Sequence, residues 1–131
     1  MARLAQALAL AAALGGATLS AQALRNVERV SIDDLKAMMA ATSVDLIDVR
    51  EPASFQKGRI PGAININYTD IPKHAGRFAG EKRTIVTYCA CTNETTAARA
   101  AVDLGARGVP GVKALKGGWD EWVSRRETIE K

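Results

Sequence analysis

The feature that most constrains the fold is a regular alternation, from residue 27 onward, of short β-rich runs with segments of helical periodicity. The β-rich runs are VDLIDV at 44–49, AINI at 63–66, TIVTYC at 84–89 and GVKAL at 111–115. The helical segments lie at 32–40, 52–57, 70–79, 95–107 and 118–127. Such alternation predicts an α/β fold, with a parallel sheet flanked by helices on both faces.

Local signals mark the ends of two of these helices. Ser31 precedes IDDLKAMMA, with Asp34 three residues later, which is typical of an N-cap. Pro52 fits the first turn of the next helix. We expect Gly58 to end that helix.

The first 23 residues, MARLAQALALAAALGGATLSAQA, predict a secretory signal peptide. One cation, Arg3, precedes an Ala/Leu-rich stretch, and small residues at Ala21 and Ala23 suit cleavage. The alternatives are an uncleaved anchor and a cytosolic helix, but the stretch falls short of the ~20 apolar residues that span a bilayer. We therefore expect residues 24–131 to form the mature domain, periplasmic or secreted, without membrane contact unless the segment is retained.

Charge and histidine content exclude several classes of function. The formal charge is +4, but Lys and Arg are scattered, so no nucleic-acid-binding surface is predicted. His74, the only histidine, lies in a polar helix start and is predicted to be a surface residue. Two cysteines and one distant histidine are too few soft ligands for a zinc site, so we expect no metal.

The two cysteines, Cys89 and Cys91, lie in YCACTNETTAAR, where strand 84–89 turns into helix 95–107. Parallel sheets bind ligands at the carboxyl ends of their strands. A loop from strand to helix points backbone N–H groups inward, and the helix N-terminus adds partial positive charge, so the loop can hold an anion. This environment favours the nucleophilic thiolate of a cysteine and would equally stabilise a persulfide.

Three motifs in order carry a resemblance to a known family. They are LIDVREPASFQKGRIPGAINI, then IVTYC followed by an Ala-rich helix, then LKGGWDEW. From about Val30 to Trp122 the chain resembles the rhodanese-like domain. The resemblance implies a five-stranded parallel sheet and a sulfurtransferase without a cofactor. Such an enzyme moves sulfane sulfur from a small donor, such as thiosulfate, to a thiol or cyanide through a cysteine persulfide.

The resemblance leaves two registers for the catalytic cysteine. The family's cysteine directly follows the strand, which selects Cys89 as nucleophile and leaves Cys91 as the alternative or resolving thiol. A register counted back from the helix selects Cys91 instead. The position of the family's loop arginine is then Glu94 or Thr96, so no cation occupies the loop.

Without that cation, we expect backbone N–H groups and threonine hydroxyls to hold the substrate. Glu94 would repel an anion, so a thiol persulfide or polysulfide is predicted to be a better donor than thiosulfate. The predicted substrate-binding residues are Ala90, Cys91, Thr92, Asn93, Glu94, Thr95 and Thr96.

Three further residues are predicted to support the site. The resemblance implies that Asp48 and Arg50 organise the framework through hydrogen bonds and an ion pair. Arg99 is the cation nearest to the loop and is expected a turn into the helix.

Two other functions stay open at this point. One is a thiol–disulfide redox protein that uses the Cys-x-Cys pair with a reducing partner protein. The other is a non-catalytic rhodanese-like binding module. A tyrosine phosphatase is disfavoured because neither cysteine has the arginine six positions later that would clamp a phosphate.

Overall fold

The computed structural model describes residues 21–131, of which 21–26 are helical. The predicted signal peptide therefore lies, except for its last three residues, outside the described residues. Within the part of the chain that is described, no helix has the length and apolar character needed to cross a bilayer.

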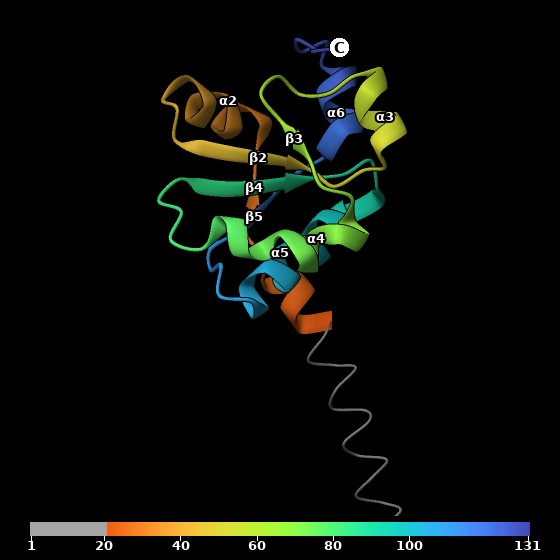
Figure 1. The fold of residues 1–131 in the computed structure, drawn as a ribbon. Helices are drawn as coiled ribbons and strands as arrows, with labels where there is room; N and C mark the ends of the chain where they lie inside the picture. The colour runs from red at the N-terminus through yellow and green to blue at the C-terminus, as the bar shows by residue number, and fades with distance from the viewer. Residues whose placement is uncertain (1–20) are drawn as a thin grey trace, which may run out of the picture.

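Five parallel strands form one sheet, as predicted, and their order is β1-β5-β4-β2-β3 (Figure 1). Since the strands are parallel, their carboxyl ends lie along one edge, and the chain leaves the central strand β4 at that edge. The strands are β1 (Arg29–Val30), β2 (Val44–Asp48), β3 (Ile64–Asn65), β4 (Thr84–Tyr88) and β5 (Lys113–Leu115).

Helices cover both faces of the sheet, with α2, α3 and α6 on one face and α4 and α5 on the other (Figure 1). The α-helices are α2 (Ile32–Ala40), α3 (Pro52–Lys57), α4 (Ile71–His74), α5 (Thr95–Ala106) and α6 (Gly118–Ser124). Short 3-10 helices are η1 (Tyr68–Asp70), η2 (Ala75–Phe78) and η3 (Thr92–Glu94).

The sheet separates two apolar cores, and β4 contributes alternate residues to each. Val86 and Tyr88 are buried on the side of α2 and α6. Ile85 and Cys89 are buried on the side of α4 and α5. This alternation follows from the period-two geometry of a strand, and it turns the side chain of Cys89 toward α5.

The helix signals in the sequence are confirmed in part. The Ser31 hydroxyl accepts the N–H of Asp34 at 3.0 Å, and α3 ends at Gly58. The single helix predicted at 70–79 is instead the succession η1, α4 and η2. Pro72 and Gly76 explain the difference, because Pro lacks an N–H and Gly disfavours a continuous helix.

The loop after β5 brings α6 against the carboxyl end of β4. The N–H of Trp119 donates to the carbonyl of Cys89 at 2.9 Å. Gly118 has φ +54°, and a Cβ there would lie far inside van der Waals contact with the Cys89 carbonyl oxygen. Gly118, the second glycine of LKGGWDEW, is therefore required for this close approach.

We expect Gly118→Ala to lower the free energy of unfolding by about 2–3 kcal/mol, through backbone strain and the clash with Cys89. Gly105→Ala is the matched control, because Gly105 lies within α5 and has no atom within 4 Å of a built Cβ. That control should stabilise the protein by roughly 0.5–1 kcal/mol. Urea unfolding of both variants measures the difference, and equal effects would show that the contact with Cys89 is unimportant.

Candidate active site

The candidate site is the loop that joins β4 to α5. Its backbone turns sharply, because Asn93 and Glu94 adopt left-handed conformations with φ of 56° and 55°. Asn tolerates this region, whereas Glu adopts it at a cost of order 1 kcal/mol that its surroundings have to offset. The loop therefore depends on contacts that hold Glu94 in place.

Cys89 and Cys91 are joined by a disulfide, with 5.6 Å between their Cα atoms. Their surroundings differ. Cys89 is 4% exposed and belongs to the apolar core between the sheet and α5. Cys91 is half-buried, and its Sγ accepts the N–H of Thr96 at 3.4 Å. The sulfur that lies at the start of α5 is thus that of Cys91.

The other predicted substrate-binding residues lie around this loop. The Thr95 hydroxyl donates to the Thr92 carbonyl at 3.0 Å and so stabilises the loop itself. Ala90, Thr92 and Asn93 are exposed. The backbone N–H of Thr96 is therefore the donor that the structure places at a cysteine sulfur.

The carboxylate of Glu94 is neutralised by a cation that sequence analysis missed. Arg29 of β1 places its Nε 3.2 Å from Glu94 Oε1, with side-chain exposures of 24% for Arg29 and 15% for Glu94. The second carboxylate oxygen, Oε2, accepts the N–H of Gly117 at 3.4 Å. Glu94 is therefore a structural anchor of the loop, rather than the free repelling charge that the sequence suggested.

Arg29 also fixes the backbone on both sides of this ion pair. Its guanidinium donates to the carbonyls of Leu24 and Val27 at 2.8 and 2.6 Å and to that of Asn93 at 3.3 Å. Nothing local in the sequence marks this residue, because it lies 65 positions before Glu94. The strand order, in which β1 pairs with β5, brings it to the loop.

Asp48 and Arg50 form a buried ion pair at the carboxyl end of β2. Asp48 is fully buried and accepts the backbone N–H and the guanidinium of Arg50 at 2.6–3.0 Å. Arg50 also donates to the Gly58 carbonyl at 2.8 Å and stacks 4.2 Å from the ring centre of Trp119. Burial alone would lower the pKa of Arg50, but hydrogen bonds and the charge of Asp48 raise it overall.

Tyr88, the last residue of β4, adds a fixed polar contact beside this pair. Its hydroxyl accepts the N–H of Ile60 at 3.2 Å. Burial, assisted by the charge of Asp48, raises the pKa of Tyr88, so the phenol stays neutral. These contacts link β2, β4, α3 and α6 behind the cysteine loop.

The remaining candidate residues lie at the surface. Arg99 is an exposed residue of α5, and His74 is exposed at the end of α4. Among the described residues, no cluster of three or more His, Cys, Asp or Glu could hold a metal ion.

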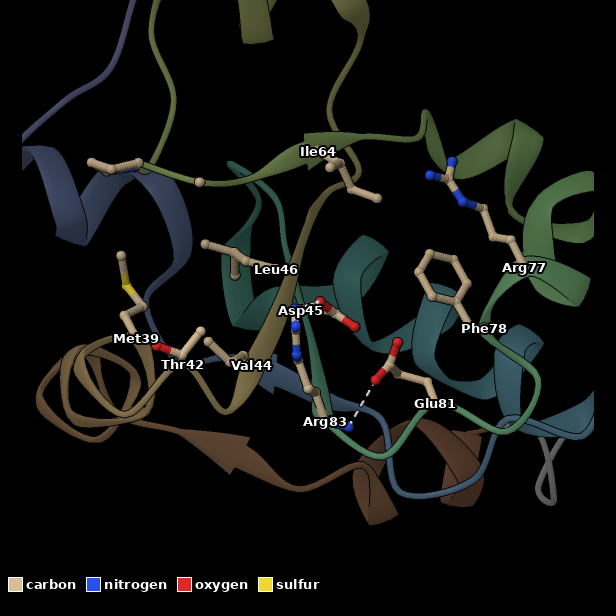
Figure 2. Close-up of a pocket in the computed structure, with 12 residues that line it drawn as sticks. Met39, Thr42, Val44, Asp45, Leu46, Ile64, Arg77, Phe78, Glu81 and Arg83 are labelled. Atoms are coloured by element: carbon tan, nitrogen blue, oxygen red, sulfur yellow. Dashed lines mark hydrogen bonds and ion pairs between the residues drawn. The ribbon is translucent and has the colours of Figure 1, made fainter.

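A groove of about 460 Å³ lies at the opposite, amino-terminal end of β2 and β4 (Figure 2). Figure 2 shows Asp45, Glu81 and Arg83 in its centre, between Met39 on one side and Phe78 on the other. Arg83 Nη1 lies 3.3 Å from Asp45 Oδ1, and the backbone N–H of Arg83 donates to Glu81 Oε1 at 3.0 Å. The groove is separate from the cysteine loop, because it adjoins the other edge of the sheet.

Comparisons with known proteins identify relatives in sequence. A model of the rhodanese-like domain family matches residues 31–125, well over half of the chain. The thiosulfate sulfurtransferase GlpE of Shewanella oneidensis is 28% identical over 99 residues, which are 76% of this chain and 95% of that protein. The uncharacterized protein YqhL of Bacillus subtilis is 36% identical over 77 residues, 59% of each chain.

Solved structures show the same fold. The human single-domain sulfurtransferase TSTD1 superposes with a TM-score of 0.64 at 22% identity, covering 76% of this chain and 98% of that one. At this level of identity the likeness concerns the fold alone.

Asp45, which lies in the groove, should make the stability of the protein depend on pH. Burial raises the pKa of Asp45, and the neighbouring Glu81 raises it further. The folded protein therefore binds this proton more readily than the unfolded chain, so the ionised carboxylate costs stability above the folded-state pKa. We expect Asp45→Asn to stabilise the protein at pH 7 by about 0.5 kcal/mol. The gain should disappear at a pH below the ordinary carboxyl pKa, where Asp45 is protonated in both the folded and the unfolded protein. Urea unfolding at the two pH values measures the difference. Stabilisation of equal size at both would show that the charge of Asp45 is not its cause.

Arg29 and Glu94 should be energetically coupled. We expect Arg29→Ala to destabilise the protein by about 2 kcal/mol, because three carbonyls, two of them in partly buried hydrogen bonds, and the Glu94 carboxylate lose their donor. In a double-mutant cycle with Glu94→Gln, measured by urea unfolding, the coupling should be about 1 kcal/mol.

The exposed pair Lys73 and Asp70 is the control for this cycle, with 3.6 Å between Nζ and Oδ1 and exposures of 78% and 45%. Its coupling should be close to zero. Equal coupling in the two pairs would mean that the contact with Arg29 does not hold the loop.

Proposed function

Because the chain belongs to the rhodanese-like family, we propose that it is a sulfurtransferase that carries sulfane sulfur as a persulfide on a cysteine of the loop between β4 and α5. The observation that carries this proposal is the position of the cysteine pair, with the N–H of Thr96 directed at Cys91 Sγ. Backbone N–H groups at a helix start favour an anion, and a persulfide is an anionic nucleophile.

The proposed donor is a thiol persulfide or polysulfide, and the acceptor a thiol or cyanide. Thiosulfate is a dianion, and a cation in the loop would serve it best. Arg29 contacts the loop backbone at Asn93, and its guanidinium is engaged by Glu94 and by three carbonyls. A donor with a single negative charge therefore suits the loop better.

The disulfide favours one alternative, a thiol–disulfide redox protein that carries no sulfane sulfur. It also bears on location, because disulfides persist in oxidising compartments. Together with the leader-like residues 1–23, this supports a periplasmic or secreted protein. There the cysteine pair would need a reducing partner, which we propose to be a dithiol protein.

The proposal predicts a sulfur-loaded chain. After reduction, the full chain incubated with glutathione persulfide should gain one sulfur atom by intact mass, transiently or stably, and transfer it to an acceptor. Glutathione persulfide should exceed thiosulfate in kcat/KM by about 10- to 100-fold, because a missing hydrogen bond to a charged group is worth ~1.5–3 kcal/mol.

The double variant Cys89→Ser, Cys91→Ser is the control and should gain no sulfur. Oxidation of the reduced chain to its disulfide by glutathione disulfide, with no sulfur gained and no hydrosulfide released from glutathione persulfide, would favour the redox alternative. Sulfur transfer by the double variant would refute a cysteine persulfide.

A further inference from the structure

The two cysteines are placed for two different chemical tasks. Cys89 is 4% exposed and packs among apolar residues of β2, β3 and α5. Its carbonyl accepts the N–H of Trp119, so its backbone is fixed between the sheet and α6. This sulfur is therefore largely shielded from a donor molecule in solvent.

Cys91 has the opposite character. It lies one residue further into the loop, is half-buried, and its Sγ accepts the N–H of Thr96 at the start of α5. The carboxylate of Glu94 is turned away to Arg29 and Gly117, so it does not oppose an anion there. Cys91 is thus the sulfur that a small donor can reach and that the loop can hold as an anion.

The disulfide shows that the buried sulfur and the accessible one reach bonding contact within this fold. A thiol in that position is able to attack Cys91 Sγ from the protein side and to displace a sulfur atom bound to it. A persulfide on Cys91 can therefore be resolved by Cys89 itself, without an external molecule entering the loop.

We propose that Cys91 carries the persulfide and that Cys89 resolves it, so that the protein reduces persulfides to hydrosulfide. This inference rests on the proposed function, since it requires that the loop accepts sulfane sulfur. It reverses the roles that the strand register of the sequence suggested for the two cysteines.

The reaction balances in three steps. The Cys91 thiolate attacks the outer sulfur of a thiol persulfide, the donor S–S bond breaks, and the donor leaves as a thiolate that takes a proton from water. The Cys89 thiol loses its proton and attacks Cys91 Sγ; the Cys89–Cys91 bond forms, and the outer sulfur leaves as hydrosulfide. Two equivalents of an external thiol then reduce the protein disulfide and become a disulfide themselves.

In this cycle the outer sulfur is reduced to the level of sulfide, and the electrons come from the cysteine pair. The external thiol restores them, so it acts as the reductant rather than as a sulfur acceptor. The structure, with its disulfide closed, corresponds to the chain after hydrosulfide has left.

The test is a single turnover of the full chain, reduced, freed of reductant and mixed with glutathione persulfide. The wild type should release hydrosulfide and end as the intramolecular disulfide. Cys89→Ala should gain one sulfur on Cys91, keep it, and lose the hydrosulfide burst. Cys91→Ala should gain no sulfur. Hydrosulfide is measured by a trapping dye, and the site of the added sulfur by mass spectrometry of peptides.

A second variant guards against a packing effect at the buried position. Cys89→Ser lacks the thiol but differs from Cys89→Ala in polarity and volume, so the same loss of the burst in both assigns it to the thiol. Thermal unfolding of each variant confirms that the fold is retained.

The outcomes separate this inference from the proposed function. Sulfur found on Cys89 in Cys91→Ala, or a wild type that keeps its persulfide without releasing hydrosulfide, would overturn the inference and leave the sulfurtransferase intact. Absence of added sulfur and of hydrosulfide in all chains would overturn both.

Discussion

The hydrogen bond from Trp119 to the carbonyl of Cys89 joins the parts of the molecule on which the site depends. It ties the first residue after β4 to the start of α6, and it exists only because Gly118 lets the two backbones approach. With Cys89 held in this way, the chain has to turn at residues 90–94 before α5 can begin. The position of Cys91 is a consequence of that turn.

Two carboxylates around the loop are paired with arginines of the protein itself. Asp48 is matched by Arg50 on the α3 and α6 side, and Glu94 is matched by Arg29 of β1. Both ion pairs are partly or fully shielded from solvent, and each stabilises backbone that leaves a strand or begins a helix. An anionic sulfur in this loop therefore depends on backbone N–H groups, which suits a singly charged persulfide better than a dianion.

The sequence predicted the parallel sheet and the strand-to-helix loop because both follow from local periodicity and from recognisable motifs. It did not show β1 as a separate run, since two residues cannot display a period. It could not reveal Arg29 as the partner of Glu94, because that contact depends on which strands are neighbours. The environments of Cys89 and Cys91 were equally hidden: strand alternation turns Cys89 inward, but where Cys91 lies depends on the left-handed turn at Asn93 and Glu94.

The strand and the helix select different residues of the loop between β4 and α5, which is why two registers could be drawn for one cysteine. Counting from the strand selects a residue that the sheet buries, and counting from the helix selects a residue at the N–H groups of α5. A loop with a single cysteine must place it both next to the strand and next to the helix. Here the two positions are occupied by separate cysteines whose sulfurs meet, so the buried one is available as a partner for whatever the accessible one has bound.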